Sequence, residues 1–294
     1  MRIVTRPDFD GVVCAVVIAE ALEIRSPVVW LEPNDFQQGR AGIRAGDIVA
    51  NLPYHPACAV WIDHHATNSA DRPFDGIFRE APSAARLALE YFAPRLKRDF
   101  SELVAWADRI DSADVTRDMV RHPERYDYVL LSMTVSGEER SDEPYWNHLV
   151  RLLGSRPIGA VMADPETAER GRRVIAQNAR YAGILKTHTR VERHVSITDL
   201  RELDPPPGGN RFLAYSLFPE TSVNLRIRRD PACAENLVVN IGQSIFNPGC
   251  RVHLGRLLAG FGGGGHRGAA STRFPAGLAD EYLPRIIDAL LENR

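Results

Sequence analysis

The sequence predicts an α/β protein of two domains: a parallel sheet with helices on both faces, then a smaller α/β domain. Three observations support this fold class. The strand-like runs of the first hundred residues are apolar throughout, as in strands buried on both faces. Helical patterns alternate with these runs, an order typical of parallel sheets. The 294 residues, 44% hydrophobic and 25% charged, are enough for two hydrophobic cores.

The first domain is expected to begin with a short strand at 2–5 and a mostly buried helix at 11–25. Three more apolar runs predict strands at 28–31, 47–51 and 58–63. Helical patterns follow at 83–92, 100–111, 126–133 and 146–153. A long arginine-rich helix is predicted from Pro165 to residue 185, because proline is favoured in the first turn of a helix.

After that helix the pattern changes to shorter runs separated by turns. These runs predict strands at 193–198, 212–218, 223–228 and 237–241. A helix at 254–259, a glycine run, a final strand and an amphipathic helix at 279–291 complete the chain. We therefore expect a first domain over 1–164, a connector helix over 165–190 and a second domain over 191–294.

Charge and hydropathy narrow the classes of function. The net charge is −2, from 36 basic and 38 acidic residues, so no overall field attracts long duplex nucleic acid or an anionic membrane. No apolar run approaches the roughly 18 residues that a membrane span needs. The first residues lead directly into a strand-like run, without the pattern of a signal peptide. We expect a cytoplasmic protein.

Polar side chains follow three of the predicted strands at the point where each strand ends. They are Asp8 and Asp10, then Asn51, and then Asp63, His64 and His65. Because the carboxyl ends of parallel strands share one edge, these groups are expected to meet in one crevice. That much negative charge is unfavourable without a cation. Mixed carboxylate and imidazole ligands suit Mn²⁺, Fe²⁺ or Co²⁺.

A further carboxylate is expected from the helix at 100–111. Asp108 and Asp111 are three residues apart and share a face of that helix, so either could reach the crevice. Each acidic residue taken alone has a simpler explanation. Asp8 and Asp10 could cap the next helix, and a pair of histidines could be a solvated surface feature. Their joint placement after successive strands favours the metal site.

The second signal is a glycine run that ends on a histidine and an arginine. Its central residues are Gly263, Gly264, Gly265, His266 and Arg267. Glycines let backbone N–H groups approach an anion closely, and the two cationic side chains would complete a phosphate-binding loop. The alternative is a flexible linker. The position between a predicted helix and a predicted strand favours the phosphate-binding loop.

These motifs, taken in this order, resemble the DHH/DHHA1 phosphoesterases. The resemblance rests on Asp8-x-Asp10, on Asp63-His64-His65 and on Gly262-Gly-Gly-Gly-His-Arg-Gly-Ala-Ala270. The family includes RecJ-type exonucleases, nano-RNases and exopolyphosphatase-related proteins. It implies a catalytic domain, a DHHA1 substrate-binding domain and an active cleft between them. It also implies Mn²⁺ or another divalent metal, and Asp8, Asp10, His64 and Asp111 as metal ligands.

The chain departs from the family at two positions. The family's first motif begins with a histidine where this chain has Arg6, and the aspartate that bridges two metals corresponds to Asn51. The resemblance then implies one metal rather than two, with Arg6 supplying positive charge in place of the other, since arginine cannot ligate a metal. Together with Arg6, the residues expected to be catalytic are Asp63 and His65.

Two functions follow. The first is a hydrolase acting on a phosphodiester or phosphoanhydride of a small nucleotide, a short oligonucleotide or polyphosphate, with a possible homodimer. The second is a catalytically degenerate protein that binds a nucleotide or polyphosphate. A metal at Asp10, His64 and Asp111 with room for a water would favour the hydrolase.

Overall fold

The structure is a computed structural model that describes residues 1–135 and 140–293. It divides into two compact units. The first unit contains Met1–Val115 and Pro123–Val174. The second contains Thr116–His122 and the residues from Ile175 onward. The long helix α9, Pro165–His188, contributes to both units.

The first unit is built on a parallel sheet with the strand order β2-β1-β3-β4-β5. The strands are β1 Ile3–Thr5, β2 Val29–Trp30, β3 Ile48–Ala50, β4 Val60–Asp63 and β5 Gly76–Phe78. The first four confirm the predicted strands. The sequence did not predict β5, because three half-buried residues carry neither a long apolar run nor an alternating pattern.

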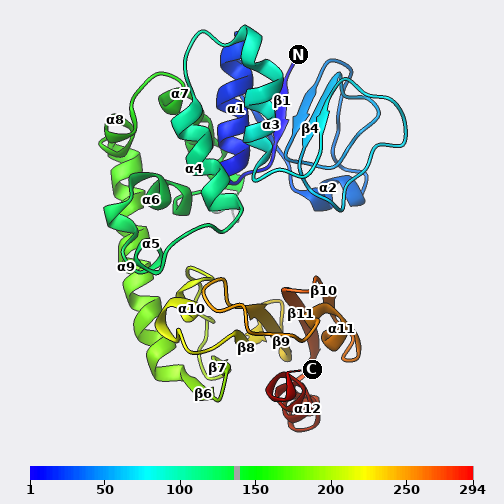
Figure 1. Cartoon of the computed structure of the whole chain (residues 1–294), viewed down its shortest axis with the longest axis vertical. Coiled ribbons are helices and arrows are strands. Elements are labelled where there is room, and N and C mark those ends of the chain that lie inside the picture. Colours follow the sequence, from blue (N-terminus) through cyan, green and yellow to red (C-terminus); the bar gives the residue numbers. More distant parts are fainter. Residues whose placement is uncertain (136–139, 294) are drawn as a thin grey trace. The chain divides into compact units, whose positions relative to one another are not determined.

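Alternate residues of the central strands face two separate cores. Ile3, Ile48 and Ile62 pack with the helices α1, α3, α4 and α7. These helices span Phe9–Leu22, Ala84–Phe92, Ser101–Asp111 and Glu143–Leu153, and Figure 1 shows α1 and α3 side by side at the sheet. The other face carries Val49 and Trp61, which pack with residues of the loops and of α2, Pro33–Gln37.

The remaining helices of this part of the chain are short. They are α5 Arg117–Arg121, α6 Asp127–Met133 and α8 Ile158–Met162. Single 3-10 turns lie at Ala93–Arg95, Pro123–Arg125 and Arg140–Asp142. Helix α5 packs in the second unit, where the Asn178 side-chain amide donates to the Val120 carbonyl at 3.2 Å.

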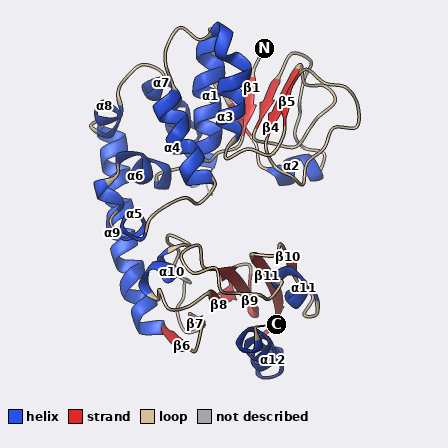
Figure 2. Cartoon of the chain, viewed as in Figure 1, coloured by secondary structure: helices blue, strands red, loops and turns tan. Residues whose placement is uncertain are grey.

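The second unit contains a mixed sheet with the strand order β10-β11-β9-β8-β7-β6, in which only β7 and β8 run parallel (Figure 2). Its strands are β6 Thr189–Glu192, β7 Val195–Asp199, β8 Val223–Asp230, β9 Cys233–Gln243, β10 Gly264–Gly265 and β11 Ala269–Pro275. Helices α11, Leu254–Ala259, and α12, Ala279–Glu292, share one core with this sheet. A 3-10 turn at Ala276–Leu278 precedes α12.

One predicted strand is wrong. The segment 212–218 forms the one-turn helix α10, Leu213–Leu217. Its apolar and aromatic residues suit a strand, but a run this short does not distinguish a strand from a buried helical turn. The Asn210 side chain accepts a hydrogen bond from the Phe212 N–H at 3.0 Å, which starts the turn. Leu213 to Ser216 are buried.

The helices predicted from the sequence are confirmed, with ends that differ by a few residues. The segment 254–259 agrees at both ends. Within the described residues, no helix is both long enough and apolar enough to cross a membrane.

Candidate functional site

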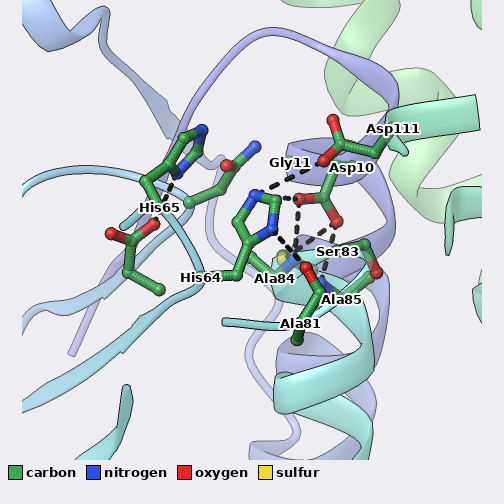
Figure 3. Close-up of polar contacts among 12 residues, drawn as sticks. Asp10, Gly11, His64, His65, Ala81, Ser83, Ala84, Ala85 and Asp111 are labelled. Atoms are coloured by element: carbon green, nitrogen blue, oxygen red, sulfur yellow. Dashed lines mark hydrogen bonds and ion pairs between the residues drawn. The ribbon is translucent and has the colours of Figure 1, made fainter. Parts of the chain in front are cut away.

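Asp10 lies in the first turn of α1, at the carboxyl edge of the parallel sheet. Its side chain is 1% exposed, and its two oxygens accept hydrogen bonds from the N–H groups of Ala84 and Ala85, at 2.9 and 2.8 Å (Figure 3). These N–H groups begin α3, where a helix has unpaired donors and favours an anion. Burial nevertheless raises the pKa of Asp10 well above its usual value, and Asp111 and Asp8 raise it further.

His64 follows β4 and turns its imidazole toward Asp10. Its Nδ1 lies 3.0 Å from the carbonyl oxygen of Ala81. A carbonyl oxygen only accepts hydrogen bonds, so Nδ1 carries a proton, and the tautomer with that single proton presents a lone pair at Nε2. Nε2 is buried without a hydrogen-bond partner, at 3.8 Å from Asp10 Oδ2 and 3.4 Å from Asp111 Oδ2 (Figure 3).

This arrangement fits a divalent cation. A nitrogen lone pair and two carboxylates repel one another unless positive charge lies between them. Asp10, His64 and Asp111 each offer one ligand atom, and these atoms all lie within 4.8 Å of one another. We refer to these three residues as the ligand triad. No other group of this kind occurs among residues 1–135 and 140–293. Three protein ligands leave positions open for water or substrate.

The structure also distinguishes the two aspartates of α4. Asp108 accepts a hydrogen bond from the Ser83 hydroxyl at 2.6 Å and one from Arg86 Nε at 2.9 Å. That carboxylate therefore pairs with the residues that begin α3. Asp111, one turn further along α4, is the aspartate that approaches His64.

Asp63 and His65 form a second interaction beside the triad. His65 Nδ1 lies 2.8 Å from Asp63 Oδ1, and the other Asp63 oxygen accepts a hydrogen bond from the Asn68 side chain at 2.7 Å. Asp63 is fully buried. Its hydrogen bond raises the pKa of His65, and burial opposes that shift. The rings of His64 and His65 meet edge to face, with centroids 4.3 Å apart.

Sequence reasoning missed Asn68 and the Ala81 carbonyl. A single asparagine five positions after Asp63 carries no recognisable signal, and a backbone carbonyl carries none. Each of these two groups fixes the orientation of a side chain of the DHH motif. Asn68 holds the Asp63 carboxylate, and Ala81 sets the tautomer of His64.

Asp8, expected as a metal ligand, lies outside the ligand triad. It caps α1: its Oδ1 accepts from the Gly11 N–H at 2.8 Å and from the Asn51 side-chain amide at 2.9 Å. Its Oδ2 lies 3.3 Å from Arg6 Nε, which also donates to Glu32 at 3.3 Å. Burial raises the pKa of Asp8 to about 6, and the charge of Arg6 opposes the shift. Sequence reasoning did not identify Glu32.

The glycine run in the second unit is an ordered turn followed by a short edge strand. Gly262 has a φ of +74° and Gly265 one of +148°, both in the region that favours glycine. A Cβ at Gly263 would lie 2.3 Å from the Ser271 carbonyl oxygen. Side chains are excluded here by close backbone packing, so the flexible-linker alternative does not describe this segment.

His266 and Arg267 follow this turn. Their carbonyls accept hydrogen bonds from the N–H groups of Gly255 and Leu254, at 2.9 and 3.1 Å, which fixes their backbone against the start of α11. Both residues are exposed. The loop thus presents two cationic side chains beside the edge strand of Gly264 and Gly265.

A cavity of about 420 Å³ lies next to this edge strand within the second unit. Its lining includes two arginines, two tyrosines and three asparagines: Arg211, Arg226, Tyr181, Tyr215, Asn210, Asn224 and Asn240. Arg226 Nη1 lies 3.2 Å from the Tyr181 hydroxyl, and Asn240 is its cross-strand neighbour. Sequence reasoning missed this cavity. The alternation of polar and apolar residues over 223–228 could have indicated the polar face.

Comparison with known proteins identifies the fold. No family model matches this chain, and no curated protein matches it either. The structure is similar to that of the pGpG-specific phosphodiesterase PggH from Vibrio cholerae, with 28% identity and a TM-score of 0.87. The match covers 100% of this chain and 99% of that one. The chain has the fold of the DHH/DHHA1 phosphoesterase superfamily.

More distant structures of this superfamily share the fold. The RecJ protein from Thermus thermophilus, in complex with Mn²⁺, is 14% identical with a TM-score of 0.58. That match covers 99% of this chain and 52% of RecJ. An exopolyphosphatase-related protein from Bacteroides fragilis is 13% identical with a TM-score of 0.54, over 99% of this chain and 92% of that one.

The three residues of the Asp63-His64-His65 motif have different roles. His64 faces Asp10 and Asp111, whereas Asp63 and His65 bond to each other. The motif therefore contributes one member of the ligand triad and one oriented histidine beside it.

Proposed function

We propose that this protein is a metal-dependent phosphodiesterase that hydrolyses a short linear dinucleotide, with pGpG as the first substrate to test. The observation that carries the proposal is the buried Nε2 of His64, which faces two carboxylates without a hydrogen-bond partner. The likeness to the pGpG-specific phosphodiesterase PggH supports the substrate class.

The residues of the first unit have distinct parts in this function. A divalent cation bound at the ligand triad would activate the attacking water and offset charge on the phosphoryl group. His65, oriented by Asp63, would donate a hydrogen bond to a phosphoryl oxygen from its other ring nitrogen. Asn68 holds the Asp63 carboxylate, so it would act on His65 only through that carboxylate.

The second unit has groups of its own that would bind a phosphate and a base. The edge strand of Gly264 and Gly265 leaves room for a close anion, and His266 and Arg267 supply positive charge. The neighbouring cavity offers Arg226 for a phosphate, and tyrosines and asparagines for the faces and edges of a base. A cavity of about 420 Å³ suits a small ligand rather than a polymer.

The direct test is hydrolysis of pGpG by the full chain in the presence of Mn²⁺, compared with pApA, polyphosphate and a bis-nitrophenyl phosphate ester. The variant His64→Ala should abolish turnover of every substrate. His148→Ala is the matched control, because His148 pairs with Asp164 at 3.1 Å and lies outside the triad. Turnover of pGpG well above that of the other substrates is the expected result.

A second candidate function is a catalytically degenerate protein that binds nucleotide or polyphosphate. It is favoured by the two departures from the family's metal ligands, Arg6 and Asn51. Calorimetric binding of pGpG or polyphosphate, with no hydrolysis of any of the four substrates in Mn²⁺, would establish this function in place of the phosphodiesterase.

A further inference from the structure

We infer that the metal centre holds a single cation, because the position beside Asp8 is already neutralised by two groups of the chain itself, the guanidinium of Arg6 and the amide of Asn51. The inference rests on the proposed metal-dependent function. The resemblance to the family implies a second metal near Asp8, and the residues present there do not fit one.

The hydrogen bonds of Asp8 leave little capacity for a metal. Its Oδ1 accepts from the Gly11 N–H and from the Asn51 amide, so both lone pairs of that oxygen are engaged. Its Oδ2 lies 3.3 Å from Arg6 Nε. A cation at Oδ1 would have to displace the hydrogen bond that caps α1. A cation at Oδ2 would be repelled by the positive charge of Arg6.

The orientation of Asn51 follows from its partner. A carboxylate oxygen only accepts, so the side-chain nitrogen of Asn51 must face Asp8. The backbone supports this placement: Asn51 has a φ of +55° and its N–H donates to the Ile62 carbonyl at 3.0 Å. Asn51 is 1% exposed, so the amide cannot turn away into solvent. Toward Asp8, where a bridging carboxylate would attract a cation, the chain presents a donor, while the amide oxygen of Asn51 is buried without a hydrogen-bond partner.

Arg6 is held on two sides. Its Nε lies 3.3 Å from Asp8 and 3.3 Å from Glu32, so one permanent positive charge stands between two carboxylates. A guanidinium stays protonated at any physiological pH and has no lone pair to give to a metal. Arg6 therefore performs the neutralising part of a cation but cannot activate a water.

The ligand triad differs in this respect. Nε2 of His64 is buried without a hydrogen-bond partner, and it faces the carboxylates of Asp10 and Asp111. One position of the crevice fits a cation, and the neighbouring position already contains positive charge. This contrast is the basis for a stoichiometry of one.

The test is Mn²⁺ stoichiometry of the full chain by equilibrium dialysis, with EPR to separate isolated ions from an exchange-coupled pair. We expect one Mn²⁺ per chain and the spectrum of an isolated ion. The double variant Arg6→His with Asn51→Asp should bind a second Mn²⁺ and show coupling, because it replaces two donors with two ligands. Arg72→His, at an exposed arginine that pairs with its neighbour Asp71, should leave the stoichiometry at one.

The outcomes separate this inference from the proposed function. Two coupled Mn²⁺ ions in the unmodified chain would overturn the inference and leave the metal-dependent function standing. No bound Mn²⁺ would overturn the proposed function together with the inference. The unmodified chain alone decides between these results, so a failure of the double variant to fold does not remove the test.

Discussion

Two neighbouring carboxylate clusters at the edge of one sheet differ in what neutralises their charge. Asp8 is surrounded by donors from the chain: a helix N–H, an amide and a guanidinium. Asp10 also accepts two helix N–H groups, but on its other side it faces Asp111 and the lone pair of His64. Donors of the chain itself engage the first cluster, whereas the second is a group of ligand atoms close enough together to hold a cation. Position at a strand end therefore does not by itself make an aspartate a metal ligand.

The largest effect should come from Asp10. Asp10→Ala removes one ligand and should abolish Mn²⁺ binding and lower kcat by about 10³-fold. Dialysis and pGpG hydrolysis measure the two effects. Asp71→Ala is the control, because Asp71 is an exposed partner of Arg72. Retention of stoichiometric Mn²⁺ by Asp10→Ala would show that the triad does not hold the metal.

The next effect concerns the second unit. Arg226→Ala removes one of the two arginines that line the cavity and should raise the KM for pGpG by about 30-fold, since a hydrogen bond to a charged group contributes about 2 kcal/mol. Mn²⁺ stoichiometry should not change, because Arg226 belongs to the other unit. Arg285→Ala, at an exposed arginine of α12, is the control. An unchanged KM would exclude this cavity as a substrate site.

A smaller effect is expected at Asp8, and it distinguishes the two clusters most directly. Asp8→Ala should weaken activity by about fivefold and lower the free energy of unfolding by about 1 kcal/mol, because a helix cap is lost. The bound Mn²⁺ should remain. Thermal denaturation and dialysis check both expectations. Loss of Mn²⁺ equal to that in Asp10→Ala would mean that Asp8 is itself a ligand.

The last effect is on stability alone and concerns an ion pair of the first unit that lies outside both clusters. Burial alone would raise the pKa of Asp47, but the hydrogen bonds from Arg2 and from the Arg44 N–H lower it below its usual value. This pair therefore contributes stability above the unfolded pKa of about 4, and the contribution is lost as the pH falls through the folded pKa.

Arg2→Ala should accordingly lower the free energy of unfolding by about 1–2 kcal/mol at pH 7. The difference from the unmodified chain should shrink as the pH falls below about 4. Urea denaturation at pH 7 and pH 3 measures it. A difference that is the same at both pH values would assign the effect of Arg2 to packing rather than to charge.

Much of the fold could be predicted because its signals are local. Four apolar runs predicted the strands β1 to β4, and the helical periods predicted most of the helices. Several short elements without a distinctive pattern were missed or misassigned, β5 and α10 among them. Such elements are stabilised mainly by what packs on them, so their own residues contain little information. The segment 116–122, which belongs to the second unit, contains another such short helix, α5.

The candidate site, like the fold, could be predicted only in part. The sequence could bring Asp10, His64 and the aspartates of α4 to one edge, but it left Asp108 and Asp111 as alternatives. Ser83 and Arg86, more than twenty residues away along the chain, engage Asp108 and leave Asp111 to approach His64. The spacing of residues in the sequence cannot distinguish Asp108 from Asp111, because the difference depends on how α3 packs on α4.

By itself, the sequence determined the fold class, the edge of the sheet at which the polar groups gather, and the two positions at which this chain departs from the DHH/DHHA1 pattern. Those properties follow from the order of elements and from residue type. Only the tertiary structure decided which carboxylates keep an unneutralised side. Neutralisation depends on donors from Asn51, Arg6 and the start of α3, and these meet the aspartates only when distant segments have packed together.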